Sequence, residues 1–139
     1  MGQQQLLLII LGVIIVGIAI AVGLQLFQAG SIGANQDAMV NDMMNIAAHV
    51  EQYRIRPEAM GGGGGSMEGY VLPQRLEETG NGTYSTTAEG GEGSNEFQII
   101  GNSVPYEDQA GITLTYDPTQ DTDADRYTWN FTGLFDDAE

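Results

Sequence analysis

The sequence contains no cysteine and no lysine, and its basic side chains are four arginines and one histidine. Without cysteine the chain can form neither a disulfide nor a thiolate metal site, so redox chemistry gives no indication of its compartment. Against the four arginines stand 19 acidic residues, for a net charge of −15 with the histidine neutral. Such a charge repels nucleic acid and anionic lipid headgroups, and we therefore expect no nucleic-acid partner.

Charge of either sign is also missing from the N-terminal segment, because Asp37 is the first charged residue. The stretch Leu6–Leu24 reads LLLIILGVIIVGIAIAVGL and contains only Leu, Ile, Val, Ala and Gly. At about 1.5 Å per residue, a helix of this length crosses a hydrocarbon core of about 30 Å. The stretch is longer than the apolar core of a signal peptide and has no basic segment before it. It is therefore expected to be retained, in lipid or against copies of itself.

This apolar stretch holds two kinds of candidate contact residue. The large aliphatic ones are expected to face lipid or the core of an assembly: Leu6, Leu7, Leu8, Ile9, Ile10, Leu11, Val13, Ile14, Ile15, Val16, Ile18, Ile20, Val22 and Leu24. Small residues allow two helices to approach closely, and the candidates for this role are Gly12, Gly17, Ala19, Ala21 and Gly23.

A second helix pattern follows the apolar segment 1–35. Between residues 36 and 57 the apolar positions recur at intervals of four and three, which predicts an amphipathic helix buried along one seam: Met39, Met43, Ile46, Val50 and Tyr53. We expect one long helix, softest near residues 30–33 and ended by Pro57. The glycine-rich segment 58–69 then predicts a linker, or alternatively a backbone surface against which a neighbouring subunit packs.

The remaining residues, 70–139, predict a small acidic domain rich in strands. Strand patterns begin at Asn81 and Phe97, on either side of a polar loop at 89–95. Residues 112–116 and 127–132 alternate between apolar and polar side chains and predict two antiparallel strands. The predicted core of this domain is Tyr53, Ile112, Leu114, Tyr116, Tyr127, Trp129 and Phe131, with Trp129 and the tyrosines as its main mass. The fold class is thus α+β, a lollipop-like long helix packed on an antiparallel sheet of three to four strands.

The turn between the last two strands carries the only pattern suggestive of a metal. Its four carboxylates belong to Asp117, Asp121, Asp123 and Asp125, and Ca²⁺ binds several hard oxygens from flexible loops. The pattern lacks the glycine and distal glutamate of an EF-hand, so a solvated acidic turn is the alternative. His49 has no second histidine or cysteine to join it in a metal site. With no catalytic constellation in view, we expect a protein that is not an enzyme.

The order of these segments, and the sequence GQQQLLLIILGVIIVGIAIAVG above all, resembles the type IV pilin and pseudopilin family. In that family a peptidase cuts after a glycine, which implies Gly2 here and leaves Gln3 as the first residue. The chain differs from the family's usual pattern in two places. No basic leader precedes Gly2, and Leu7 stands where the family usually carries a glutamate at the fifth mature position.

The resemblance implies a structural subunit of an extracellular filament that polymerises by bundling its apolar helices. It further implies identical subunits, an inner-membrane platform protein and an assembly ATPase as partners. The protein would lie in the inner membrane before assembly and at the cell surface afterwards. Two alternatives stay open at this point: a single-span membrane protein with an acidic head that binds a ligand or calcium, and a pseudopilin of a secretion system.

Overall fold

The computed structural model describes residues 2–88, 96–106 and 109–136, so the predicted polar loop at 89–95 lies outside the described residues. A single helix, α1 (Gly2–Ile55), is followed by a short 3-10 helix (Glu58–Met60) and by α2 (Gln74–Glu77). The strands are β1 (Gly82–Ala88), β2 (Phe97–Ser103), β3 (Ala110–Tyr116) and β4 (Tyr127–Gly133), with α3 (Asp123–Arg126) before β4. The chain forms two compact units, residues 1–34 and residues 35–139.

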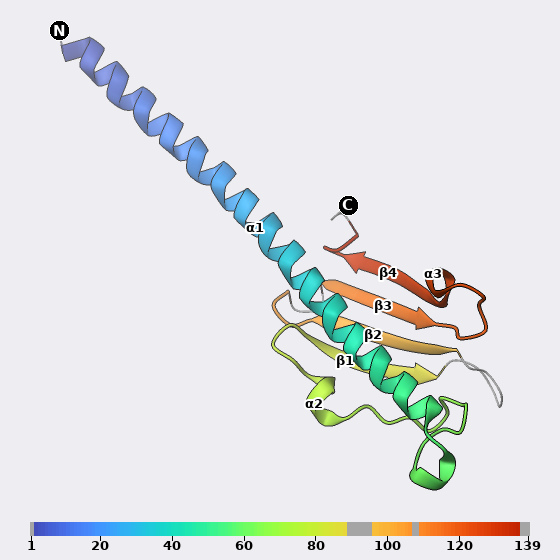
Figure 1. Ribbon diagram of the computed structural model, residues 1–139. Coiled ribbons are helices and arrows are strands. Elements are labelled where there is room, and N and C mark those ends of the chain that lie inside the picture. The colour runs from blue at the N-terminus through green and yellow to red at the C-terminus, as the bar shows by residue number, and fades with distance from the viewer. Residues whose placement is uncertain (1, 89–95, 107–108, 137–139) are drawn as a thin grey trace. The chain divides into compact units, whose positions relative to one another are not determined.

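The four strands form one antiparallel sheet in the order β1-β2-β3-β4, so each strand pairs with its neighbour in sequence (Figure 1). In β2 and β3 buried and less buried residues alternate, as expected for strands with one face against a core. Together with α1 this confirms the predicted α+β class: a long N-terminal helix whose C-terminal part packs on a small antiparallel sheet.

The core lies between this sheet and residues 39–50 of α1. The predicted helix seam is confirmed at Met39, Met43, Ile46 and Val50, each at most 1% exposed. From the sheet and its connections the core takes Met67, Leu72, Tyr84, Phe97, Ile99, Ala110, Ile112, Leu114, Tyr116 and Phe135. Unbranched methionines fill irregular space well, which suits a helix lying across a twisted sheet.

The last strand departs from the prediction. Ile112, Leu114 and Tyr116 of the predicted core are buried, but Tyr53, Tyr127, Trp129 and Phe131 are only half-buried. Tyr53 lies in the last turn of α1. For β4 the physical reason is position: α1 crosses the sheet over the other strands and leaves this edge strand less covered (Figure 1). Trp129 and Phe131 therefore stack on each other, with ring centroids 6.4 Å apart, and Trp129 is not a main component of the core.

The glycine run closes the end of α1. Backbone N–H groups of Gly63 and Gly65 donate to the carbonyl oxygens of Tyr53 and Arg54, at 2.9 and 2.8 Å. Gly65 has a φ of +106°, and a Cβ on Gly63 would lie 1.8 Å from the carbonyl oxygen of Ser66, so only glycine fits. Part of the segment predicted as a linker thus forms a hydrogen-bonded cap that satisfies carbonyls at the end of the helix.

Polar side chains fix the helix on the sheet at separate points along its length. At the first residue of the second unit, Asn35 donates to the carbonyl oxygen of Asn81 and accepts from the hydroxyl of Ser103 at 2.7 Å. Two turns further the carboxylate of Asp42 accepts three hydrogen bonds of 2.9 to 3.0 Å through one oxygen, from Thr79, Asn81 and Tyr84. Burial, and then the carboxylate of Asp42, raise the pKa of the Tyr84 hydroxyl, which therefore stays a donor.

The same cluster gives a test of the fold. Replacing Asp42 with Ala leaves three donors without their shared acceptor, and hydrogen bonds to charged groups contribute about 1.5 to 3 kcal/mol. We expect Asp42→Ala to lower the free energy of unfolding of the detergent-solubilised chain by about 2 to 3 kcal/mol, measured by urea unfolding with Trp129 fluorescence. The exposed Asn45→Ala is the control, and equal losses in the two variants would contradict the role of Asp42.

Candidate functional site

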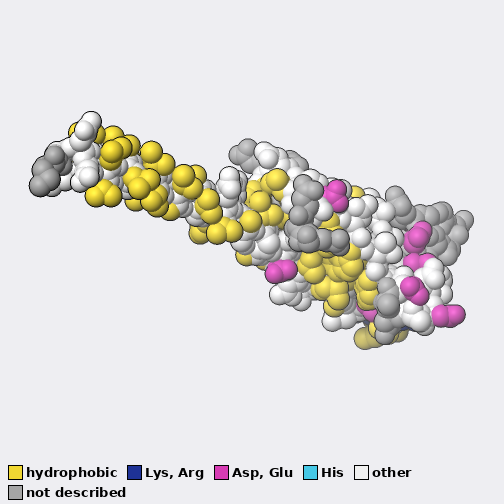
Figure 2. Space-filling view, turned by 90° about the horizontal axis from the view of Figure 1, so that it is seen from above, with side chains coloured by type: hydrophobic (Ala, Val, Ile, Leu, Met, Phe, Trp, Pro, Cys, Tyr) yellow, Lys and Arg dark blue, Asp and Glu magenta, His cyan; other side chains and the backbone are white. Residues whose placement is uncertain are grey.

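The N-terminal unit is a helix whose apolar side chains are exposed on every side. Leu7 is 64% exposed, Ile18 60% and Val22 49%, and all the predicted large aliphatic residues from Leu6 to Leu24 are similarly uncovered. Figure 2 shows apolar side chains along this part of α1, whereas acidic side chains appear over residues of the other unit. Since burying one such side chain is worth about 1.5 to 3 kcal/mol, this surface needs a partner other than water.

The exposed apolar surface extends beyond the predicted boundary at Leu24. Leu26 is 71% exposed and Phe27 76% exposed, and neither belonged to the predicted contact residues. The sequence already indicated that the uncharged segment continues past Leu24, because its first charged residue is Asp37. Leu26 and Phe27 were missed because the glutamines at 25 and 28 interrupt the apolar run. By length and composition α1 is long and apolar enough to span a membrane, and none of its apolar window is buried within the chain.

Small residues form a line along this helix. Gly12 is followed by Ala19, Gly23 and Gly30 at about two, three and five whole helical turns, so the four residues share one side of α1. Of these, Gly30 was missed because it lies outside the apolar run. Gly17 and Ala21, the other two predicted packing residues, lie on a different side.

Contacts among the described residues do not explain the glycines of this line. A Cβ added at Gly12, Gly23 or Gly30 would meet no atom within 4 Å. A glycine inside a helix costs about 0.5 to 1 kcal/mol relative to alanine. Small residues at such positions allow the backbone of another helix to approach closely, so the line is suited to a contact made outside the chain.

The predicted calcium site lies in the turn between β3 and β4. Asp117 accepts hydrogen bonds from the backbone and side chain of Thr119 and from the amide of Gln120, and these donors lower its pKa. Asp125 accepts from the hydroxyl of Thr122, and Asp121 is exposed. The side chain of Asp123 lies outside what the structure describes. Among the described residues no three carboxylates converge on a common point, so calcium binding stays a prediction.

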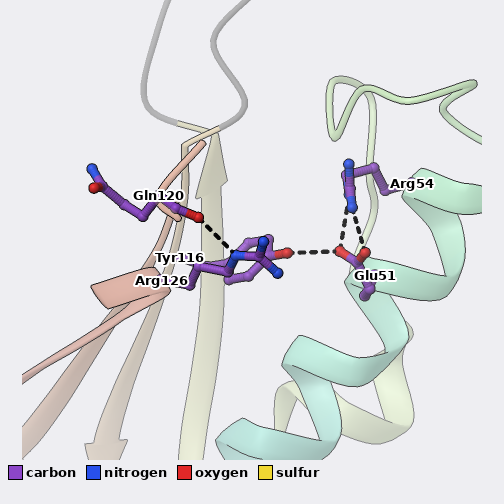
Figure 3. A network of polar contacts seen from close by, with 5 residues as sticks. All are labelled: Glu51, Arg54, Tyr116, Gln120 and Arg126. Atoms are coloured by element: carbon purple, nitrogen blue, oxygen red, sulfur yellow. Dashed lines mark hydrogen bonds and ion pairs between the residues drawn. The ribbon is translucent and has the colours of Figure 1, made fainter. Parts of the chain in front are cut away.

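Beside this turn, Glu51 links α1 to β3. Its carboxylate accepts from the hydroxyl of Tyr116 at 3.1 Å and from the guanidinium of Arg54, with Nε at 2.9 Å (Figure 3). On the far side of Tyr116, Arg126 donates to the backbone carbonyl of Gln120 and so closes the turn. The Arg54 guanidinium, and after it the Tyr116 hydroxyl, hold the pKa of Glu51 below its usual value of 4.5, although partial burial acts in the opposite direction.

The other residues singled out in the sequence are Gly2, Gln3 and His49. Gly2 and Gln3, the predicted processing positions, are exposed in the first turn of α1, and cleavage there stays a prediction. His49 is half-buried and shares a 2.9 Å hydrogen bond with the hydroxyl of Tyr70. Their rings meet edge to face, and Tyr70 packs in the same way on Phe97. His49 thus belongs to the contact between helix and sheet.

Comparison of the chain with protein-family models, with curated proteins and with solved structures finds no match. The fold alone, a long N-terminal apolar helix with a small antiparallel sheet, is compatible with a pilin-like protein.

The lowered pKa of Glu51 predicts a pH dependence of stability. A carboxylate with a depressed folded-state pKa stabilises the fold above its unfolded pKa, near 4.5, and this contribution is lost as the pH falls through the folded-state value. The difference in urea midpoint between the native chain and Glu51→Gln should therefore shrink from pH 7 to pH 3. The exposed Glu77→Gln should give a small difference throughout. A Glu51→Gln effect that is constant with pH would contradict this assignment.

Proposed function

We propose that this chain is the structural subunit of an extracellular, type IV pilus-like filament. In this proposal the segment Leu6–Leu24 first anchors the protein in the inner membrane and then packs against the same segment of neighbouring copies. Residues 35–139 form the head that remains in water. The partners are identical subunits, and by resemblance a platform protein and an assembly ATPase.

One observation carries this proposal: the apolar part of α1 is exposed on every side and includes glycines at which an added Cβ would meet no atom of the described residues within 4 Å. A membrane anchor requires the first property alone, whereas a helix bundle uses both. The neutral stretch from Gln25 to Gln36 gives further support, because a simple anchor would be expected to meet water soon after the span.

Assembly from lipid has a particular energetic requirement. Lipid tails are as apolar as leucine, so the hydrophobic effect contributes little when such a helix leaves the membrane for a bundle. Close van der Waals contact between helices has to supply the attraction, and an external energy source has to drive extraction. This is why the line through Gly12, Ala19, Gly23 and Gly30 matters for the proposal.

Two alternatives share the same anchor. A single-span protein whose acidic head binds a ligand or calcium needs only the apolar segment, and a pseudopilin would assemble into short fibres only. Electron microscopy of sheared extracellular material, with mass spectrometry of its N-terminal peptide, distinguishes them. Uniform long fibres made of this chain are the expected result, and the peptide identifies the first residue. Protein confined to the membrane fraction of expressing cells would overturn the proposal.

The small-residue line gives a sharper test. In the double variant Gly12→Leu/Gly23→Leu two bulky side chains separate the helix backbones, while the segment remains apolar enough to enter lipid. We expect the protein to reach the membrane normally but the fibre yield to fall by about tenfold or more, which corresponds to roughly 1.4 kcal/mol of lost packing. The matched control is Val13→Leu/Val22→Leu, which adds methylenes on other sides of the helix. Fibre yields that fall equally in both variants would contradict the assignment.

A further inference from the structure

We infer that the outer edge of β4 is a docking site for an extended, basic peptide segment of a different protein, which joins the sheet as an additional strand antiparallel to β4. This site, called here the β4 edge, consists of the strand Tyr127–Gly133 and the pocket beside it. The inference concerns the head alone and does not depend on the proposed function.

The backbone of β4 is open on one side. It is the last strand in the sheet order, and among the described residues it pairs with β3 alone. Where this pairing begins, the N–H of Asp117 donates to the carbonyl oxygen of Arg126 at 2.9 Å. Bonded and non-bonded pairs alternate along an antiparallel ladder, so every second residue from Arg126 onward bonds to β3. The backbone groups of Tyr127, Trp129 and Phe131 therefore point toward the open edge.

This edge lacks the usual protection of an exposed strand. Native proteins commonly protect such edges with charged side chains, proline or a bulge. The sequence of β4 is YTWNFTG, with no charge and no proline, and its register with β3 is continuous. At the opposite edge of the sheet, by contrast, Thr83 of β1 pairs with Glu78. An uncharged, unprotected edge is suited to pairing with a strand from another chain.

A pocket of about 370 Å³ lies beside the open edge. It is lined by Gln36, Trp129, Asn130, Phe131, Phe135 and Asp136. Trp129 and Phe131 pair with the buried Leu114 and Ile112, so their side chains lie on the helix side of the sheet. Strand addition takes its affinity from main-chain hydrogen bonds and its specificity from pockets for alternate side chains. In β4 the two residues whose backbone groups face the edge also line the pocket.

The surroundings of the β4 edge indicate the charge of its partner. In Figure 2, which shows the β4 side of the head, apolar side chains gather on the head with acidic side chains around them. Asp136 lines the pocket itself, and segment 61–139 has 15 acidic residues and two arginines. This field attracts a strand rich in Lys or Arg and repels a second, equally acidic head. The partner segment therefore alternates apolar side chains over the pocket with basic ones on the other face.

A synthetic peptide of alternating Val and Lys tests the inference on the detergent-solubilised full-length chain. Trp129 is the only tryptophan, so its emission reports binding at this site, together with the anisotropy of a label on the peptide. In an antiparallel addition the valines opposite Trp129 and Phe131 share their face and exchange backbone hydrogen bonds with them, whereas the lysine N–H groups point away. We expect N-methylation of the valine N–H groups to weaken binding about tenfold or more. N-methylation of the lysine backbone, the matched control, should leave binding unchanged.

A pair of protein variants tests the same hydrogen bonds from the other side. Phe131→Pro removes an N–H that faces the open edge, whereas Phe131→Leu keeps that N–H and an apolar side chain. We expect the proline variant to bind the peptide about tenfold more weakly than the leucine variant. Circular dichroism checks that both fold. If Phe131→Pro does not fold, the N-methylated peptides decide the question, because they leave the protein unchanged.

Three results would overturn the inference. Equal binding of the two N-methylated peptides would show that a basic peptide is attracted to the acidic head without joining the sheet. Binding of an alternating Val and Glu peptide as tight as that of the Val and Lys peptide would remove the role of charge. Tighter binding of a peptide copied from residues 127–133 would identify a second copy as the occupant. None of these measurements requires fibres, so their outcome is separate from that of the proposed function.

Discussion

The constraint on which this molecule depends is that a charge-free apolar helix cannot remain in water. From Leu6 to Phe27 the large side chains are exposed within the part of the chain that the structure describes. Each would release about 1.5 to 3 kcal/mol on burial. The N-terminal unit is therefore incomplete as a structure in water, and its stable environment is supplied by lipid or by other helices.

The head has a different requirement, because it has a strongly acidic composition and must still hold the C-terminal part of the long helix against its sheet. Apolar contact through Met39, Met43 and Ile46 supplies the burial, and polar contacts fix the position. Asp42 and Glu51 each accept hydrogen bonds from hydroxyl groups of the sheet, which sets the register of the helix along the strands. Asp42 and Glu51 on the helix thus serve the fold.

Under the proposed function, this distribution of charge has a consequence for assembly. Acidic surfaces of neighbouring heads would repel one another, whereas the apolar segment carries no charge. Under the proposed function the apolar segment provides attraction and the acidic head suppresses disordered aggregation. Closure of the helix end by the glycine run also fits this arrangement, since the last carbonyls of α1 are satisfied by Gly63 and Gly65.

The sequence by itself determined the elements: the apolar run, the four-three spacing of the seam and the alternation at 112–116 each reflect a local periodicity. It could not determine which strand lies at the edge, because that depends on pairing between distant segments, and so it placed Trp129 in the core. Nor could it reveal that the glycine run caps the helix, or that Asp42 and Glu51 face the sheet. Those properties arise from contacts between residues far apart in the chain, and only the tertiary structure decided them.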